Sequence, residues 1–376
     1  MEQFCQDKAK IAIVGGGPAG VYCALNILDL FQKYNFNGFS ITLFDKGQIL
    51  RTILPTGGSR CNITNSIPDI REFASNYPRG EKFLYSLFAR HFNYDSLEFF
   101  KTIGIETYIQ DDGRVFPVSN SSKDVRDKMF DILRKNRNVK LVNKNISNKD
   151  ELKDFDYVVI AVGSRGVENL LNSLKQPYIP FKKTLCSLVV KDFNFPVGVS
   201  VNSLDGDFLF TQDGISGPLA FKISSLNLNK TLPFDISINL FDYQDLMKII
   251  EKNPKKSIGN LVSRFIPKSL ARVIVDDFDK NSAEISLEKI KNYSKLNLTV
   301  LNFSQKGEIV NSGGIDLNSI DKNCKSKIQD NLWFCGEVLN IDGFCGGFNL
   351  QNCWSSGYVV ANDLVSSIIV KDNNME

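Results

Sequence analysis

Three glycines near the N-terminus have the spacing to hold the phosphates of a dinucleotide. Gly15, Gly17 and Gly20 form a Gly-x-Gly-x-x-Gly pattern directly after a short apolar run. In that pattern the first glycine permits a tight turn, the second lets the backbone approach a pyrophosphate, and the third lets a helix pack on the strand. The N-terminus of that helix favours an anion. Asp45 ends the next apolar run and suits a hydrogen bond to the adenosine ribose, so the pattern predicts NAD or FAD.

Two later loops have residues suited to the flavin end of FAD. The stretch from Thr56 to Asn65 combines small residues, one cation and five amide or hydroxyl side chains, and can approach a flat polar ligand closely. The stretch from Gly343 to Gln351 opens onto a helix whose N-terminus would stabilise negative charge on a reduced flavin. A solvated turn and an ordinary helix cap are the alternatives. Gly163–Gly166 lacks the dinucleotide pattern, so we expect one firmly bound FAD, with NADH or NADPH as a transient reductant.

The residue types make several other kinds of active site hard to build. The chain has one histidine, His91, which argues against a Ser-His-Asp hydrolase or a multi-histidine metal site. None of the eight cysteines forms Cys-x-x-Cys, so no metal site or thioredoxin-type pair is indicated. A cofactor is therefore expected to carry the chemistry, and a packing histidine and inert thiols are the simpler interpretations. The candidates for a catalytic side chain are weak: Arg60, Cys61 and Asn62, with Tyr108 or Asp213 from elsewhere.

The composition is that of an ordinary globular protein. The chain has 376 residues, 43% of them hydrophobic and 23% charged, and this length predicts two or three domains. The formal net charge of +3 gives little support for a nucleic-acid binder by itself. We see no signal peptide and no apolar run of membrane length, so we expect a cytoplasmic protein without membrane contact.

Hydrophobic periodicity predicts an α/β fold that begins with a strand–turn–helix–strand unit. The expected strands of the first part lie at 10–14, 40–44, 139–142 and 156–163, and the expected helices at 19–34, 80–103 and 124–136. From about 185, short strands alternate with turns, and helical spacing follows at 243–252, 257–277 and 287–295. The nucleotide domain resumes near Gly307, with a strand at 331–337 and a helix at 349–367. We expect a discontinuous dinucleotide domain (1–184 and 306–376), an inserted β domain (185–240 plus about 296–305) and a small helical insert (241–295).

Five motifs, in order along the chain, carry a resemblance to a known family. They are GGGPAG (15–20), TGGSRCNITN (56–65), FTQDGISGP (210–218), SGGI (312–315) and WFCGEVLNIDGFCGGFNLQNCWSSGY (333–358). On these anchors the sequence resembles the YhiN/BaiN-like family of FAD-dependent oxidoreductases, also labelled the aminoacetone oxidase family. The resemblance implies a Rossmann-type FAD-binding domain, glutathione-reductase-like, interrupted by an inserted β-barrel-like domain with a small helical subdomain.

The resemblance also implies which residues contact the cofactor. The family commonly has glycine where Ser59 stands, tyrosine where Phe348 stands and histidine where Gln212 stands, so any acid–base role of that histidine does not apply here. The positions that match the family's binding loops are Gly15, Gly17, Pro18, Ala19, Gly20, Asp45, Lys46, Thr56, Gly57, Gly58, Ser59, Arg60, Cys61, Asn62, Ala161, Gly163, Gly336, Glu337, Gly346, Gly347, Phe348, Asn349 and Gln351.

Members of this family are associated with reduction of a conjugated C=C bond in steroid-like acids and with dihydrouridine formation in ribosomal RNA. The resemblance therefore implies an NAD(P)H-driven flavin reductase that delivers hydride to an activated C=C bond of a small molecule or of ribosomal RNA. Basic runs at 182–183, 252–256 and 264–272 support RNA only weakly, because charge runs are usually solvated faces. The alternative is a non-catalytic FAD-binding protein whose insertion binds a partner. An NAD-dependent dehydrogenase would leave the 56–65 and 343–351 loops without a ligand.

Overall fold

The computed structural model describes residues 8–304 and 310–373, and the chain forms two compact units. The first unit comprises Met1–Lys182 and Asn311–Glu376, and the second comprises Lys183–Val310. The boundary expected at 306 and the resumption of the nucleotide domain near Gly307 lie outside the described residues. Across 8–304 and 310–373, every helix is too short or too polar to cross a membrane.

The first unit is built on a five-stranded sheet in the order β16-β7-β1-β2-β6. All neighbouring strands run parallel, and Val14 of the central strand pairs with Phe44 on one side and Ile160 on the other. The apolar run that predicted a buried strand accounts for this position, since Ile11 and Ile13 are both fully buried. The strands are β1 (Ala9–Val14), β2 (Phe39–Asp45), β6 (Val139–Asn143), β7 (Tyr157–Ile160) and β16 (Leu332–Phe334).

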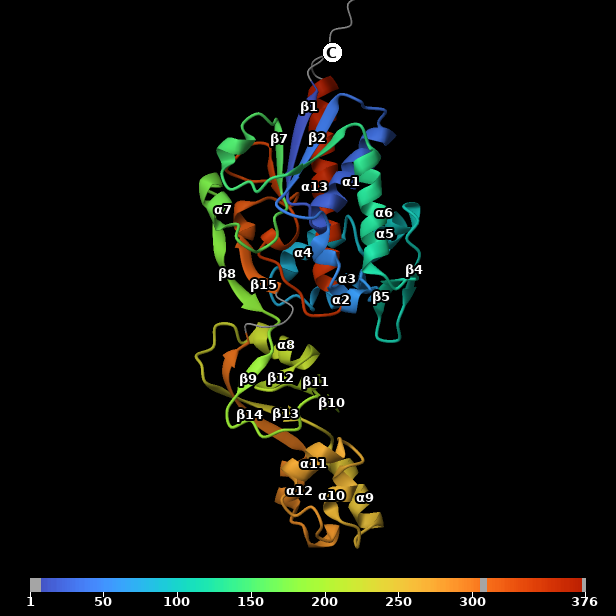
Figure 1. Cartoon of the computed structure of the whole chain (residues 1–376), viewed down its shortest axis with the longest axis vertical. Coiled ribbons are helices and arrows are strands. Elements are labelled where there is room, and N and C mark those ends of the chain that lie inside the picture. The colour runs from blue at the N-terminus through green and yellow to red at the C-terminus, as the bar shows by residue number, and fades with distance from the viewer. Residues whose placement is uncertain (1–7, 305–309, 374–376) are drawn as a thin grey trace, which may run out of the picture. The chain divides into compact units, whose positions relative to one another are not determined.

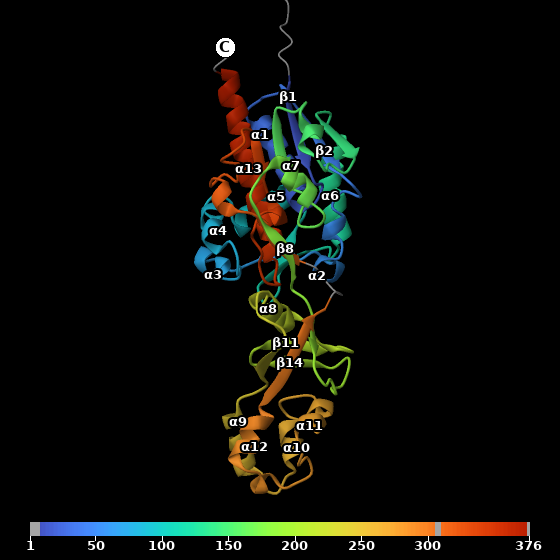
Figure 2. The same cartoon turned by 90° about the vertical axis from the view of Figure 1, so that its left-hand side faces the viewer.

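Two helices of the first unit, one from each end of the chain, run side by side (Figures 1 and 2). They are α1 (Pro18–Lys33) and α13 (Phe348–Asn373). Their close approach depends on Gly357, because a β-carbon there would lie 2.9 Å from the carbonyl oxygen of Ala19. The other helices of this unit are α2 (Thr56–Ser59), α3 (Ile70–Ala74), α4 (Glu81–Phe88), α5 (Asn93–Thr102), α6 (Ser122–Lys135) and α7 (Glu168–Leu174), with short 3-10 turns at Arg51–Ile53, Lys149–Leu152, Leu317–Ser319 and Gly336–Val338.

The remaining strands of the first unit form two small sheets outside the parallel sheet. A three-stranded sheet has the order β3-β5-β4, with β3 (Thr64–Asn65), β4 (Thr107–Ile109) and β5 (Arg114–Pro117). Strands β4 and β5 form an antiparallel hairpin around Asp112-Gly113. A two-stranded sheet pairs β8 (Tyr178–Thr184) with β15 (Val310–Ile315), the two segments through which the chain leaves and re-enters the first unit.

The second unit has its own hydrophobic core and a six-stranded sheet in the order β10-β11-β12-β9-β14-β13. Its neighbouring strands pair antiparallel, so the expected inserted β part is present. The strands are β9 (Leu188–Val190), β10 (Ser200–Ser203), β11 (Gly206–Phe210), β12 (Gly214–Ser216), β13 (Phe234–Asn239) and β14 (Lys295–Phe303), and helix α8 (Pro218–Leu226) follows β12.

Four short helices lie between β13 and β14 in the sequence: α9 (Tyr243–Lys252), α10 (Ile258–Val262), α11 (Lys268–Ile274) and α12 (Leu287–Tyr293), with a 3-10 turn at Ser282–Glu284. The prediction of a single helix over 257–277 is wrong. Pro267 caps the start of α11, and a proline cannot continue a helix because it lacks the N–H and its ring clashes with the preceding turn. The segment is therefore two helices joined by a turn.

Candidate functional site

The glycine motifs of the first unit gather at one edge of the parallel sheet. Gly15 directly follows β1, Gly163 lies just beyond β7, and Gly336 lies just beyond β16, while Asp45 is the last residue of β2. Because parallel strands end at the same edge, segments far apart in the sequence meet there. The ladder continues into the loops, since the Gly15 amide donates to the Phe44 carbonyl at 2.8 Å. This edge is where open α/β sheets bind their ligands.

The three glycines of the fingerprint differ in what surrounds them. A β-carbon at Gly15 would lie 2.2 Å from the Ala161 carbonyl oxygen, and one at Gly20 would lie 2.0 Å from the Gly15 carbonyl oxygen. These two are required by the fold itself. A β-carbon at Gly17 would meet only Thr52 Oγ1, at 3.7 Å. The backbone at Gly17 therefore has an open face beside the N-terminus of α1, as a bound pyrophosphate requires.

Backbone amides of the glycine loop and of the segment after β2 hold the Asp45 carboxylate in place. Its Oδ2 accepts from the Gly16 amide at 2.8 Å and its Oδ1 accepts from the Gly47 amide at 2.7 Å. Each carboxylate oxygen has a second lone-pair direction, so a ribose hydroxyl can still donate to it. A pocket adjoins the side chain and is lined by residues from the ends of β1, β2 and β6 and from the segment after β7: Val14, Gly15, Phe44, Asp45, Lys46, Lys144, Asn145, Ile146, Val162, Gly166, Val167 and Leu170.

The two loops expected at the flavin end are bonded to each other. Thr64 Oγ1 donates to Gln351 Oε1 at 2.7 Å, and Asn65 Nδ2 donates to the Gly346 carbonyl at 3.2 Å. With its amide turned to satisfy both neighbours, Asn62 donates to the Thr64 carbonyl at 3.0 Å and accepts from the Gly347 amide at 2.9 Å. The 56–65 and 343–351 loops are thus parts of one structure, which the sequence did not show.

The first of these loops has an unusual backbone. Gly57, Gly58, Ser59 and Cys61 all have φ between 57° and 67°, a region that costs non-glycine residues energy. Such strain clusters at ligand-binding sites, where it fixes a loop in advance. The Arg60 guanidinium lies over the Phe116 ring, 4.3 Å from its centre. The loop therefore holds its backbone and its one cation in a set position.

The structure gives the three catalytic candidates different environments. Cys61 is fully buried, and burial raises the pKa of its thiol to about 12, so it is a protonated thiol at neutral pH. Asn62 is buried and engaged with Thr64 and Gly347. Arg60 is partly exposed and its Nε donates to the Gly57 carbonyl at 3.3 Å. Only Arg60 among them combines a charge with access to solvent.

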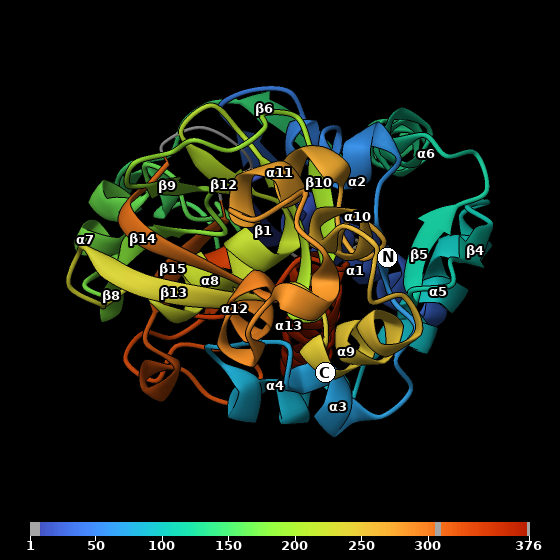
Figure 3. The same cartoon turned by 90° about the horizontal axis from the view of Figure 1, so that it is seen from below.

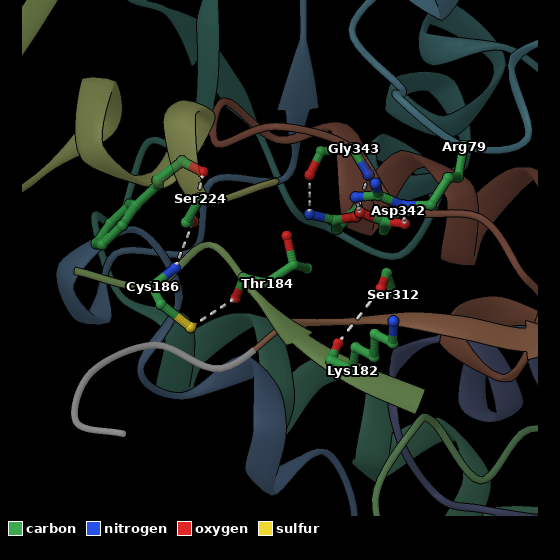
Figure 4. A network of polar contacts seen from close by, with 10 residues as sticks. Arg79, Lys182, Thr184, Cys186, Ser224, Ser312, Asp342 and Gly343 are labelled. Atoms are coloured by element: carbon green, nitrogen blue, oxygen red, sulfur yellow. Dashed lines mark hydrogen bonds and ion pairs between the residues drawn. The ribbon is translucent and has the colours of Figure 1, made fainter. Parts of the chain in front are cut away.

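The second loop is closed at its base by polar contacts. Asn349 and Gly343 exchange two hydrogen bonds, at 2.8 and 2.9 Å. Next to Gly343, the buried Asp342 carboxylate forms a two-pronged ion pair with Arg79 (Figure 4). Burial raises the pKa of Asp342, while the Arg79 charge lowers it. Sequence reasoning missed this pair: an acid beside a glycine loop was a possible signal for Asp342, but nothing in the sequence indicated Arg79.

Phe348, which was expected to contact the cofactor, places its ring in the core. The side chain is 4% exposed and packs edge-on against Phe73 and Tyr77, with ring centres 5.0 and 5.9 Å away. Tyr77 in turn donates its hydroxyl to the Phe348 carbonyl at 2.6 Å. A ligand at this loop would therefore meet the backbone of Phe348 rather than its ring.

His91 lies in a buried polar network beneath the joined loops. Its Nε2 is 2.8 Å from the Tyr22 hydroxyl and 3.2 Å from Ser96 Oγ, and its ring stacks on Tyr358 at 4.2 Å. Burial lowers the pKa of His91 to about 4, so the imidazole is neutral at physiological pH. Gln351 connects the network to the loops, because its Nε2 donates to Ser96 Oγ at 3.0 Å. The histidine has a packing role in this arrangement.

Buried polar groups near Gly336 fit a polar ligand. Burial raises the pKa of Glu337, and the charge of Arg165 opposes that rise. Within the described residues, Asn340 Oδ1 and both side-chain polar atoms of Asn352 have no hydrogen-bond partner although they are buried. Such atoms are rare in proteins and call for a partner from outside the chain or a water. The hydroxyl-rich chain of a flavin dinucleotide is a ligand of that kind.

Comparison with known proteins places these features in a family. The HI0933-like protein Rossmann domain family matches residues 9–363. The chain is 25% identical to a ribosomal RNA dihydrouridine synthase of Haemophilus influenzae, over 93% of this chain and 96% of that protein. It is also 25% identical to the Escherichia coli ribosomal RNA dihydrouridine synthase, over 94% and 98%. A 3-dehydro-bile acid delta(4,6)-reductase of Clostridium scindens is 24% identical, over 93% and 97%.

Proposed function

Since the chain belongs to the HI0933-like family and is an FAD-dependent oxidoreductase, we propose that it accepts hydride from NADH or NADPH and delivers it to an activated C=C bond. The relatives support this reaction class. One is a delta(4,6)-reductase and two make dihydrouridine, which is uridine with its ring C=C bond reduced. Hydride delivery to a conjugated C=C bond is common to both, whereas their substrates differ.

The observation that carries the proposal is the contrast between Gly17 and its two neighbours in the fingerprint. Gly15 and Gly20 are required by contacts inside the chain, but Gly17 leaves a backbone face open at the edge of the sheet. We propose that the pyrophosphate of FAD lies there, with the ribose at Asp45. FAD supplies the hydride-transfer chemistry when bound, and the chain holds and orients it.

At the flavin end, we propose that the cofactor lies against the joined 56–65 and 343–351 loops. The open space at Gly58 supports this, because a β-carbon there would meet no atom within 4 Å of the described chain. The partly exposed Arg60 is the charged group that these loops offer to a substrate or to the cofactor. The remaining proposed contacts are those that the family resemblance implied, with Phe348 contributing its backbone. We also propose that the dinucleotide domain is of the glutathione-reductase type and that the inserted sheet curves as a barrel-like unit.

A ribosomal RNA substrate is the second candidate within this reaction class. Two of the relatives are ribosomal RNA dihydrouridine synthases. The alignment with each of them covers more than nine-tenths of this chain and so includes the second unit. Membership of a family of FAD-dependent oxidoreductases does not support the alternative that this chain is a non-catalytic FAD-binding protein.

An anaerobic reduction experiment tests the proposal. Purified protein reconstituted with FAD is mixed with NADH or NADPH, and loss of the oxidised flavin absorbance is followed, after which an enone acceptor or ribosomal RNA is added. We expect bleaching by at least one nicotinamide and reoxidation by an acceptor with a C=C bond. A protein that retains no FAD, or a bound FAD that neither nicotinamide bleaches, would contradict the proposal.

A further inference from the structure

The helical part of the second unit has three exposed cations on and beside α11, which we call the basic stripe. Lys268 and Arg272 are four residues apart on α11, so they share one face of that helix. Arg264 lies in the turn that connects α10 to α11. All three residues are exposed. Figure 3 looks onto α9 to α12, the helices among which the stripe lies.

The basic stripe differs from three neighbouring lysines in its pairing. Lys248 is 2.8 Å from Asp245, Lys280 is 2.6 Å from Asp277, and Lys289 is 3.0 Å from Asp276. By contrast, none of the three stripe residues has a carboxylate within 4.0 Å in the described part of the chain. Part of the positive charge of this helical region is thus neutralised by neighbouring carboxylates, whereas the three stripe residues have no such neighbour.

The first two carboxylates that follow α11 do not neutralise the stripe, because they are engaged with other groups. Asp277 is held by Lys280 and Lys289. Asp276 accepts from Lys289 and from the Tyr293 hydroxyl at 2.5 Å, and these contacts lower its pKa to about 2. Asp276 and Asp277 therefore provide no counter-charge to the stripe.

We propose that the basic stripe binds the phosphate backbone of an RNA substrate. This inference rests on the proposed function, of which it names the partner. Exposed cations without a carboxylate partner gain affinity for a polyanion by releasing its counterions. The Arg272 guanidinium also lies over the Phe278 ring, 5.8 Å from its centre. A membrane surface fits less well, since a membrane-bound helix presents large apolar residues beside its cations. Ser269 is the exposed residue between Lys268 and Arg272, and Val273, which follows Arg272, is the one exposed apolar residue of α11.

The test compares RNA binding of the full-length, FAD-loaded protein with that of two charge variants. The stripe variant is Arg264→Gln with Lys268→Gln and Arg272→Gln. The control variant, Lys248→Gln with Lys280→Gln and Lys252→Gln, removes the same charge from the same helical region. The probe is a fluorescent stem–loop of ribosomal RNA, titrated over a range of salt concentrations. Anionic phospholipid vesicles and polyglutamate serve as competing polyanions.

We expect the stripe variant to bind the RNA at least about tenfold more weakly than the wild type at physiological salt. The slope of log K against log salt should be smaller in magnitude by about 2 to 3. The control variant should bind the RNA nearly as well as the wild type does. Equal loss in both variants, unchanged RNA binding in the stripe variant, or loss of binding only to vesicles or polyglutamate would overturn the inference. Flavin bleaching by NAD(P)H is measured on the same samples. It should be unchanged in both variants, and its absence in the wild type would count against the proposed function while leaving the RNA result readable.

Discussion

Thr64 donates a hydrogen bond of 2.7 Å to Gln351, and so joins two loops that lie 287 residues apart in the chain. Gln351 is fully buried and also donates to Ser96 and Ser355, which places this junction in the core of the first unit. The shape of the proposed flavin site therefore depends on interior packing and not on two independent surface loops.

Replacement of Gly347 by alanine should disrupt this junction. The residue has φ of +94°, and a β-carbon would lie 2.4 Å from the backbone carbon of Thr64. We expect a loss of about 2–5 kcal/mol in the free energy of unfolding, combining backbone strain with overlap, and at least about tenfold weaker FAD binding. Gly104→Ala is the control, because Gly104 has φ of +79° with nothing within 4 Å. Urea unfolding of the two variants should differ by more than about 1 kcal/mol, and equal losses would show that the junction does not matter.

Alanine at Gly17 should separate cofactor binding from folding. Gly17 has φ of −79°, which any residue adopts, and its β-carbon would be unobstructed within the chain. We expect a change in the free energy of unfolding of at most about 1 kcal/mol. FAD affinity should nevertheless fall at least about tenfold, because the β-carbon would occupy the space proposed for the pyrophosphate.

Gly20→Ala is the counterpart, since its β-carbon would lie 2.0 Å from the Gly15 carbonyl oxygen and should destabilise the fold by about 1–3 kcal/mol. Equilibrium dialysis of FAD and thermal unfolding measure the two effects. Normal FAD affinity in the Gly17 variant would refute the proposed position of the pyrophosphate.

The stability of the protein should depend on His91 in mildly acidic solution. Burial lowers the pKa of this side chain to about 4, below the value of about 6.5 in an unfolded chain, so the unfolded state takes up the proton first as the pH falls. Between about pH 7 and pH 5 this should cost about 2 kcal/mol of stability.

The raised pKa values of Glu337 and Asp342 act in the opposite sense, so the wild type is compared with His91→Gln at each pH. His91 is the chain's one histidine, and the difference between the two proteins therefore isolates its contribution. Parallel curves of unfolding free energy against pH would contradict the assignment.

Alkylation should distinguish the two cysteines of the glycine loops. Cys345 is exposed, whereas Cys61 is fully buried with a raised pKa. Iodoacetamide at neutral pH should therefore modify Cys345 in the native protein and reach Cys61 only after unfolding. If the 343–351 loop contacts the cofactor, added FAD should slow modification of Cys345. Peptide mass spectrometry follows both residues, and early labelling of Cys61 would be inconsistent with the structure.

The sequence predicted those features that are encoded locally. The strand expected at 10–14, the helix at 19–34 and the strand at 40–44 correspond to β1, α1 and β2, because apolar period and glycine spacing are properties of short segments. The break at Pro267 was missed although its signal was local. When helical spacing continues on both sides of a proline, the sequence pattern does not distinguish a proline that begins a second helix from one inside a single helix.

Contacts between distant segments could not be predicted in the same way. The pairing of β8 with β15, the ion pair between Arg79 and Asp342, and the network around His91 each join residues whose own neighbours carry no sign of the partner. Composition marked the 56–65 and 343–351 loops as unusual, but only the folded chain shows that each completes the other.

The discontinuous first unit has a consequence for the order of events during synthesis. Strand β16 pairs with β7, and α13 packs against α1 and contains Gln351. Both β16 and α13 follow the second unit in the sequence, so they leave the ribosome after it. A nascent chain can fold its domains as they emerge. Here the second unit can fold before the first unit is complete. Until β16 is synthesised, one edge of β7 has no partner strand. With FAD placed as proposed against the 343–351 loop, cofactor binding is a late event, and a chain that ends before Gly347 should be unable to complete it.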